Sequence, residues 1–76
     1  MHIFKSDEEL KKEFSSLLRK ALRKRALTQS QLADMADISR VQISHYIQGK
    51  MLPSFYNLYK IVEVLNCSPD EFHCFK

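Results

Sequence analysis

The chain has 76 residues and a formal net charge of +3, with 12 Lys and Arg against 9 Asp and Glu. This length supports one small domain and leaves no room for a second core or an enzyme-sized cleft. It contains neither an apolar run long enough to span a bilayer nor a signal-peptide core, so we expect a cytoplasmic protein without a membrane partner.

The first predicted helix covers about residues 7–25. Ser6 with Glu9 fits a capping box, and acidic residues in the first turn complement the positive end of the helix dipole. Apolar residues then recur every three or four positions, namely Leu10, Phe14, Leu17, Leu18, Ala21 and Leu22. The helix ends in a basic run of Arg19, Lys20, Arg23, Lys24 and Arg25. These cations either complement the negative pole of the helix or steer the protein toward a polyanion, and both can hold.

Two short helices are predicted next, at about 28–36 and 39–48, and together they form a helix-turn-helix at about 28–48. Thr28 with Gln31, and Ser39 with Gln42, fit the capping-box pattern at the two starts. The inward faces are predicted to be Leu32, Met35 and Ala36 on the first helix, and Ile43, Tyr46 and Ile47 on the second. The outward face of the second helix carries polar groups suited to DNA base edges and phosphates, with Arg40, Val41, Ser44, His45 and Gln48.

Two further helices are predicted, at about 54–65 and 69–74. Pro53 cannot continue a helix and Ser54 can cap the next one, while Ser68, Pro69 and Glu71 mark the start of the last. Since the pattern predicts only helices, the expected fold is all-α, a compact five-helix domain. Its predicted core contains Phe14, Leu18, Leu32, Ile43, Tyr46, Phe55, Leu58 and Ile61.

Cys67 and Cys74 favour a packing role in a reducing compartment. With His73 they would supply three metal ligands, but they lack the paired spacing of a zinc finger. The carboxylates Asp34 and Asp37 are better explained as exposed residues of the motif than as catalytic groups. We therefore expect no enzyme activity, no metal, no cofactor and no small-molecule substrate.

Residues 18–72 resemble the lambda-repressor and Cro type of helix-turn-helix, also called the xenobiotic-response-element (XRE) family. The resemblance is carried by Leu27-Thr28-Gln29, Leu32-Ala33, Ile38-Ser39-Arg40, Ile43-Ser44, Gly49-Lys50, Pro53-Ser54 and Leu65-Asn66, in this order and spacing. It implies that the second motif helix, about Ser39 to Gln48, is a recognition helix lying in the major groove of double-stranded DNA.

The resemblance also implies which residues contact DNA. Base contacts would come from Arg40, Val41, Gln42 and His45. Arg40 can donate two hydrogen bonds to one guanine, and Val41 can cover a thymine methyl group. Gln42 could instead stay occupied as the capping partner of Ser39. Phosphate contacts would come from Gln29, Ser39, Ser44, Gln48, Lys50, Ser54 and Asn57, and Gln29 would also brace Arg40. If His45 contacts DNA, binding should change between about pH 5.5 and 7.5, where an imidazole changes charge.

The chain departs from the family pattern at three places. Leu22 and Ile47 stand where many relatives have a buried Arg and Glu, so we expect these two apolar side chains to touch. Ala26 stands where relatives often end the first helix with Gly, and that helix end must find another geometry. Asp37 replaces a Gly in the motif turn, where Asp is tolerated because it adopts left-handed backbone more readily than most residues.

The leading hypothesis is a sequence-specific DNA-binding transcriptional regulator, a repressor that binds a two-fold symmetric operator as a homodimer. The dimer interface would be the C-terminal segment with Phe72, Cys74 and Phe75, or the stretch from Met1 to Phe4. A regulatory protein partner could control the activity of this regulator. The alternative is a protein-binding module, such as an antitoxin or a mobile-element accessory protein. Selection of bound sequences from random duplex DNA would separate the two.

Overall fold

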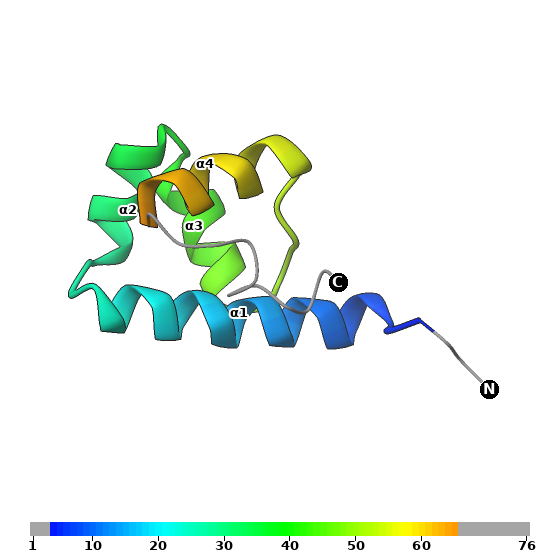
Figure 1. The fold of residues 1–76 in the computed structure, drawn as a ribbon. Helices are drawn as coiled ribbons and strands as arrows, with labels where there is room; N and C mark the ends of the chain where they lie inside the picture. Colours follow the sequence, from blue (N-terminus) through cyan, green and yellow to red (C-terminus); the bar gives the residue numbers. More distant parts are fainter. Residues whose placement is uncertain (1–3, 66–76) are drawn as a thin grey trace.

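The computed structural model describes residues 4–65, and every regular element in that range is a helix. The helices are α1 (Asp7–Lys24), α2 (Gln29–Ala36), α3 (Arg40–Ile47) and α4 (Phe55–Leu65). α1 runs along one side of the domain, and the other three helices gather on the same side of it (Figure 1). Within residues 4–65, no helix has the length and apolar character needed to cross a bilayer. The all-α prediction is confirmed for these residues, whereas the predicted helix at 69–74 lies outside them.

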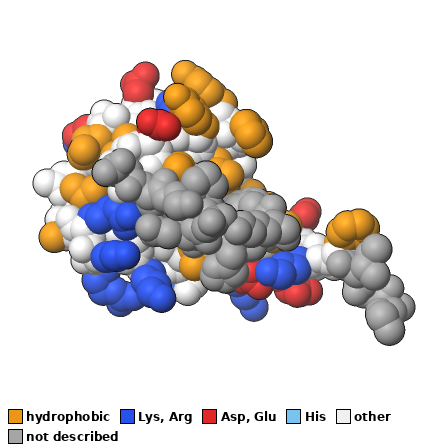
Figure 2. All heavy atoms as spheres, viewed as in Figure 1, with side chains coloured by type: hydrophobic (Ala, Val, Ile, Leu, Met, Phe, Trp, Pro, Cys, Tyr) orange, Lys and Arg blue, Asp and Glu red, His pale blue; other side chains and the backbone are white. Residues whose placement is uncertain are grey.

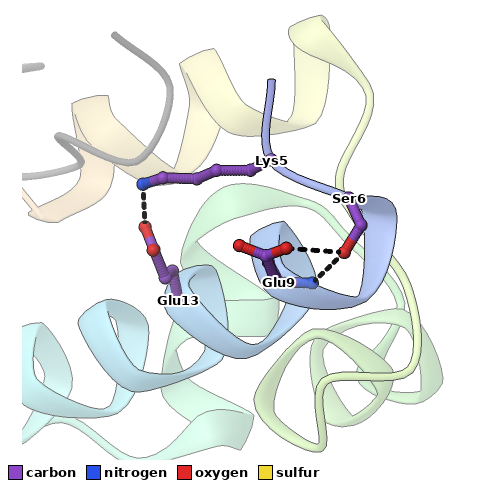
Figure 3. Close-up of polar contacts among 4 residues, drawn as sticks. All are labelled: Lys5, Ser6, Glu9 and Glu13. Carbon is purple, nitrogen blue, oxygen red and sulfur yellow. Dashed lines mark hydrogen bonds and ion pairs between the residues drawn. The ribbon is translucent and has the colours of Figure 1, made fainter. Parts of the chain in front are cut away.

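Side-chain caps set the starts of the helices. At α1, Ser6 Oγ accepts a hydrogen bond from the Glu9 amide at 3.2 Å, and the Lys5 ammonium pairs with the Glu13 carboxylate (Figure 3). At α2, Thr28 and Gln31 form a full capping box, with reciprocal bonds of 2.9 and 3.1 Å. These capping groups satisfy amides that have no partner inside the first turn. The bounds predicted for the four helices within residues 4–65 agree with the structure to within one residue.

The first three helices end in the same way, through a residue with left-handed backbone: Ala26 and Asp37 at φ 54° and Gly49 at φ 73°. The amide after each of them donates to the carbonyl five residues earlier. These bonds join Leu27 to Leu22 at 3.0 Å, Ile38 to Ala33 at 3.1 Å and Lys50 to His45 at 2.9 Å. The arrangement is that of a Schellman motif, which satisfies helix-end carbonyls. Ala26 thus adopts the geometry for which the family resemblance implies Gly.

One hydrophobic core joins the four helices. Its largest fully buried side chains are Tyr46, Phe14, Leu18, Leu32, Ile43, Ile61 and Leu65. The rings of Phe14 and Tyr46 meet edge to face, with centroids 6.0 Å apart and planes at 77°, a favourable arrangement for aromatic pairs. Of the eight predicted core residues, six are buried, Leu58 is partly buried, and Phe55 is not part of the core.

The prediction that Met35 and Phe55 point into the core is wrong. Met35 is 58% exposed and Phe55 is 89% exposed. Since successive residues turn by about 100° around a helix, Phe55 lies about 120° from the buried Ile61. Met35 likewise lies about 100° from the middle of the stripe that α2 buries with Leu32, Ala33 and Ala36. The buried stripe of α2 is therefore rotated toward Ala33 relative to the predicted stripe, and Phe55 falls outside the buried stripe of α4.

Contacts between α1 and α3 bear on the predicted pair of Leu22 and Ile47. Leu22 is buried, and Ile47 is partly buried against the same core. The Ser15 hydroxyl donates to the Ile47 carbonyl, so the end of α3 meets α1 about two turns before Leu22. The direct contact between the Leu22 and Ile47 side chains stays a prediction.

Arg25 joins the C-terminal ends of α1 and α4. Its Nε donates to the Leu65 carbonyl, and its Nη1 donates to the Ala21 carbonyl at 3.3 Å. A cation in this position complements the negative ends of two helices. The other members of the basic run are exposed, and Figure 2 shows Lys and Arg side chains gathered near the C-terminal half of α1. Within the basic run, Arg25 therefore stabilises the packing of α1 against α4.

The left-handed backbone conformation of Ala26, at the end of α1, predicts that a substitution at this position stabilises the protein. Left-handed backbone costs an alanine about 1–2 kcal/mol, and glycine avoids this cost while adding freedom to the unfolded chain. Ala26→Gly should raise the free energy of unfolding by about 1 kcal/mol, measured by urea denaturation. The matched control is Ala21→Gly in the interior of α1, which should lower it by about 1 kcal/mol. A loss of stability in Ala26→Gly would contradict the assignment of this helix end.

Candidate nucleic-acid interface

The rotation of α3 is set by the side chains that it buries. Tyr46 is 1% exposed and packs against Phe14 of α1, and its hydroxyl accepts a hydrogen bond from Asn57 Nδ2 of α4 at 3.0 Å. Ile43, one turn earlier, is fully buried. Arg40, Val41 and Gln42, the first three residues of α3, are exposed, in contrast to these two anchors.

The predicted base-reading residues lie mostly on this exposed surface. Arg40, Val41 and Gln42 are exposed, while His45 is partly buried. Ser39 Oγ caps α3 by accepting from the Gln42 amide at 3.1 Å. The side chain of Gln42 takes a weaker contact, in which its Oε1 accepts from the Ser39 hydroxyl at 3.4 Å. Gln42 thus contacts its capping partner Ser39 while its side chain stays exposed.

Arg40 has a partner that the sequence analysis missed. Its Nη2 lies 3.3 Å from Asp34 Oδ2, and the two side chains are 67% and 66% exposed. Asp34 was interpreted only as an exposed motif residue, although opposite charges facing each other across a tight turn were the available signal. The predicted bracing of Arg40 by Gln29 stays a prediction for the DNA-bound protein.

The predicted phosphate-contacting residues divide into two groups. Several are engaged within the domain: Ser39 and Ser54 cap α3 and α4, Gln48 Nε2 donates to Ser44 Oγ at 2.7 Å, and Asn57 binds Tyr46. Gln29 and Lys50 are exposed, and no side-chain hydrogen bond is recorded for either within residues 4–65. Gln29 is also the first residue of α2, where backbone amides favour an anion. The strongest phosphate candidates are thus Gln29 and Lys50.

The turn between α2 and α3 is held from outside the motif. The Lys60 ammonium of α4 donates to the Asp37 carbonyl at 3.1 Å and lies 4.7 Å from the centre of the Tyr56 ring. Ile38 in the same turn is buried. Asp37 and Ile38 of the turn are thus both in contact with the rest of the domain.

Comparison with known proteins identifies the same region. A family model described as "Helix-turn-helix" matches residues 18–72, a range that includes all of α2, α3 and α4. No curated protein matches the chain.

The bond between Asn57 and Tyr46 predicts a coupled loss of stability. Tyr46→Phe and Asn57→Ala should each lower the free energy of unfolding by about 1 kcal/mol, the net worth of one hydrogen bond. The double variant should lose little more than either single variant, because the same bond is removed. Urea denaturation of the three variants measures this coupling. Fully additive losses would show that Asn57 does not act through Tyr46.

Proposed function

We propose that this chain, which belongs to the XRE or lambda-repressor type of the helix-turn-helix family, represses transcription by placing α3 in the major groove of a two-fold symmetric operator. Family membership supports a DNA-binding transcription regulator. The observation that carries the finer proposal is the exposure of Arg40, Val41 and Gln42 at the start of α3, a helix anchored in the core by Ile43 and Tyr46. A rigidly supported polar helix face is what reading of base edges requires.

Base recognition is proposed to depend on Arg40, Val41, Gln42 and His45. The guanidinium of Arg40 can donate two hydrogen bonds to O6 and N7 of one guanine. Val41 is 64% exposed and offers a methyl surface to thymine. Gln42 supplies an amide that can both donate and accept. The partly buried His45, farther along α3, is expected to contribute less than Arg40.

Phosphate contacts are proposed to orient the domain on the duplex. Gln29 at the start of α2 and Lys50 after α3 are exposed on either side of the motif. Contacts of this kind fix the position of a protein on DNA and carry no direct sequence information. The other predicted residues would contact phosphates only where their present hydrogen-bond partners leave a donor available. These residues are Ser39, Ser44, Gln48, Ser54 and Asn57.

Selection of bound sequences from a random duplex library tests the assignment. Arg40→Ala should relax the preference at one base position of each half-site, with a loss of about 1–3 kcal/mol of discrimination. His45→Ala should act in the same way at another position, with a smaller effect. Lys50→Ala should weaken binding about uniformly and reduce the salt slope by about one.

Two outcomes would count against the proposal. Unchanged affinity and preference in Arg40→Ala would mean that another surface reads the bases. Failure of the folded wild-type protein to enrich any duplex at low salt would favour the alternative function, a module that binds another protein.

A homodimer is proposed because one recognition helix makes only a short contact with an operator. Phe55, Tyr56 and Tyr59 form an aromatic face on α4, with exposures of 89%, 66% and 55% (Figure 2). An aromatic side chain buries about 150–250 Å², whereas a standard interface buries about 800 Å² per partner. The aromatic face would supply about half of that area. It supports a weak dimer that forms on DNA.

Cooperative binding tests the dimer. Phe55→Ser should reduce cooperativity on a duplex with two half-sites by about tenfold, while leaving affinity for a single half-site unchanged. Phe4→Ser is the matched control, since Phe4 is 81% exposed and belongs to the other proposed interface. Binding titrations on one-site and two-site duplexes measure both variants. Loss of cooperativity in Phe4→Ser alone would assign the interface to the N-terminal stretch instead.

A further inference from the structure

We propose that Asp34 is a positioning residue for Arg40 and that it increases the ability of the protein to discriminate between DNA sequences. The inference rests on the proposed function of α3. Its structural basis is the contact between Asp34 Oδ2 of α2 and Arg40 Nη2, the first residue of α3, at 3.3 Å. The pair spans the turn of the motif.

The backbone holds the two residues at a fixed separation. Asp37 ends α2 in left-handed backbone, and the Ile38 amide donates to the Ala33 carbonyl at 3.1 Å. Lys60, on α4, donates a hydrogen bond to the Asp37 carbonyl, and Ile38 is buried. Because these contacts support the backbone of the turn, formation of the ion pair chiefly orders the two side chains. Asp34 therefore biases the Arg40 side chain toward one direction before DNA is bound.

The pair is weak enough to be compatible with binding. Both side chains are about two-thirds exposed, and an ion pair of this kind shifts an equilibrium by no more than about fivefold. Arginine carries five N–H donors in a planar fork, and the recorded contact uses Nη2. The other donors remain available for a guanine. Asp34 can thus hold the guanidinium while Arg40 reads a base.

The carboxylate also changes what Arg40 contributes to binding at other sequences. An unpaired arginine is attracted to any phosphate and releases counterions, which strengthens binding without regard to sequence. Pairing with Asp34 compensates that charge. Since specificity is the difference between two affinities, a lower non-specific affinity raises it. Asp34 therefore raises the affinity for the operator by positioning Arg40 at the correct base, and it lowers the affinity for other sequences by weakening phosphate contacts.

The test compares Asp34→Asn with Asp37→Asn. Both variants lose one negative charge from the motif, and Asn tolerates the left-handed backbone of residue 37. Binding is measured to the selected operator, to its variants at the Arg40-dependent position, and to a random duplex, across a range of salt. Asp34→Asn should bind the random duplex about threefold tighter, with a salt slope steeper by about 0.9. Its preference at the Arg40-dependent position should fall by about three- to tenfold.

The control variants distinguish positioning from a general charge effect. Asp37→Asn should leave the preference unchanged, whatever it does to overall affinity. In the Arg40→Ala background, Asp34→Asn should cause no further loss of preference, because the residue that it positions is absent. Melting temperatures of all variants should match the wild type, since the pair is exposed.

Two results would overturn the inference: an unchanged preference in Asp34→Asn, or the same change in Asp34→Asn and Asp37→Asn. Failure of the proposed function gives a different result, because the wild-type protein would then enrich no duplex and no preference could be compared. A preference that Asp34→Asn loses in the Arg40→Ala background as well would show that Asp34 acts on another residue.

Discussion

The burial of Tyr46 is the constraint on which the presentation of α3 depends. Its ring packs against Phe14 of α1, and its hydroxyl is bonded to Asn57 of α4, so one side chain ties α3 to two other helices. Removal of a buried aromatic side chain typically costs about 3–5 kcal/mol, a large part of the about 5–15 kcal/mol that stabilises a small domain. Ile43 and Tyr46 point inward, whereas Arg40, Val41 and Gln42 at the start of the same helix are exposed. The position of the proposed reading surface thus depends on buried side chains of the same helix.

The polar side chains of the motif serve two purposes that their residue types do not distinguish. Ser39 and Ser54 satisfy the amides at helix starts, and Asn57 satisfies a buried tyrosine. Gln29 and Lys50 extend from the surface. A serine, an asparagine or a glutamine can serve either purpose, and only the distance to a neighbouring backbone or side-chain group decides between them. The chemistry left for DNA is therefore narrower than the composition of the motif implies.

Much of the fold could be predicted from the sequence, because its strongest signals are local. Caps such as Thr28 with Gln31 act within one helical turn, and the apolar period within two or three turns. Met35 and Phe55 were mispredicted because the position and width of a buried stripe depend on the neighbouring helices, which periodicity does not describe. The bonds from Arg25 to Leu65 and from Asn57 to Tyr46 join different helices, and the pair of Asp34 and Arg40 crosses a turn. Such contacts require knowledge of how the helices pack.

The shortness of α2 and α3 has a consequence for the transfer of this motif to other proteins. Each has eight residues, whereas an isolated helix in water is marginal below about 12–15 residues. A peptide cut from this region would lose the core contacts of α1 and α4 and would not keep its shape. The exposed side chains at the start of α3, in contrast, can be exchanged without touching those contacts. Under the proposed function, the positions to vary in order to change the DNA sequence that is bound are therefore these few surface residues on the intact scaffold.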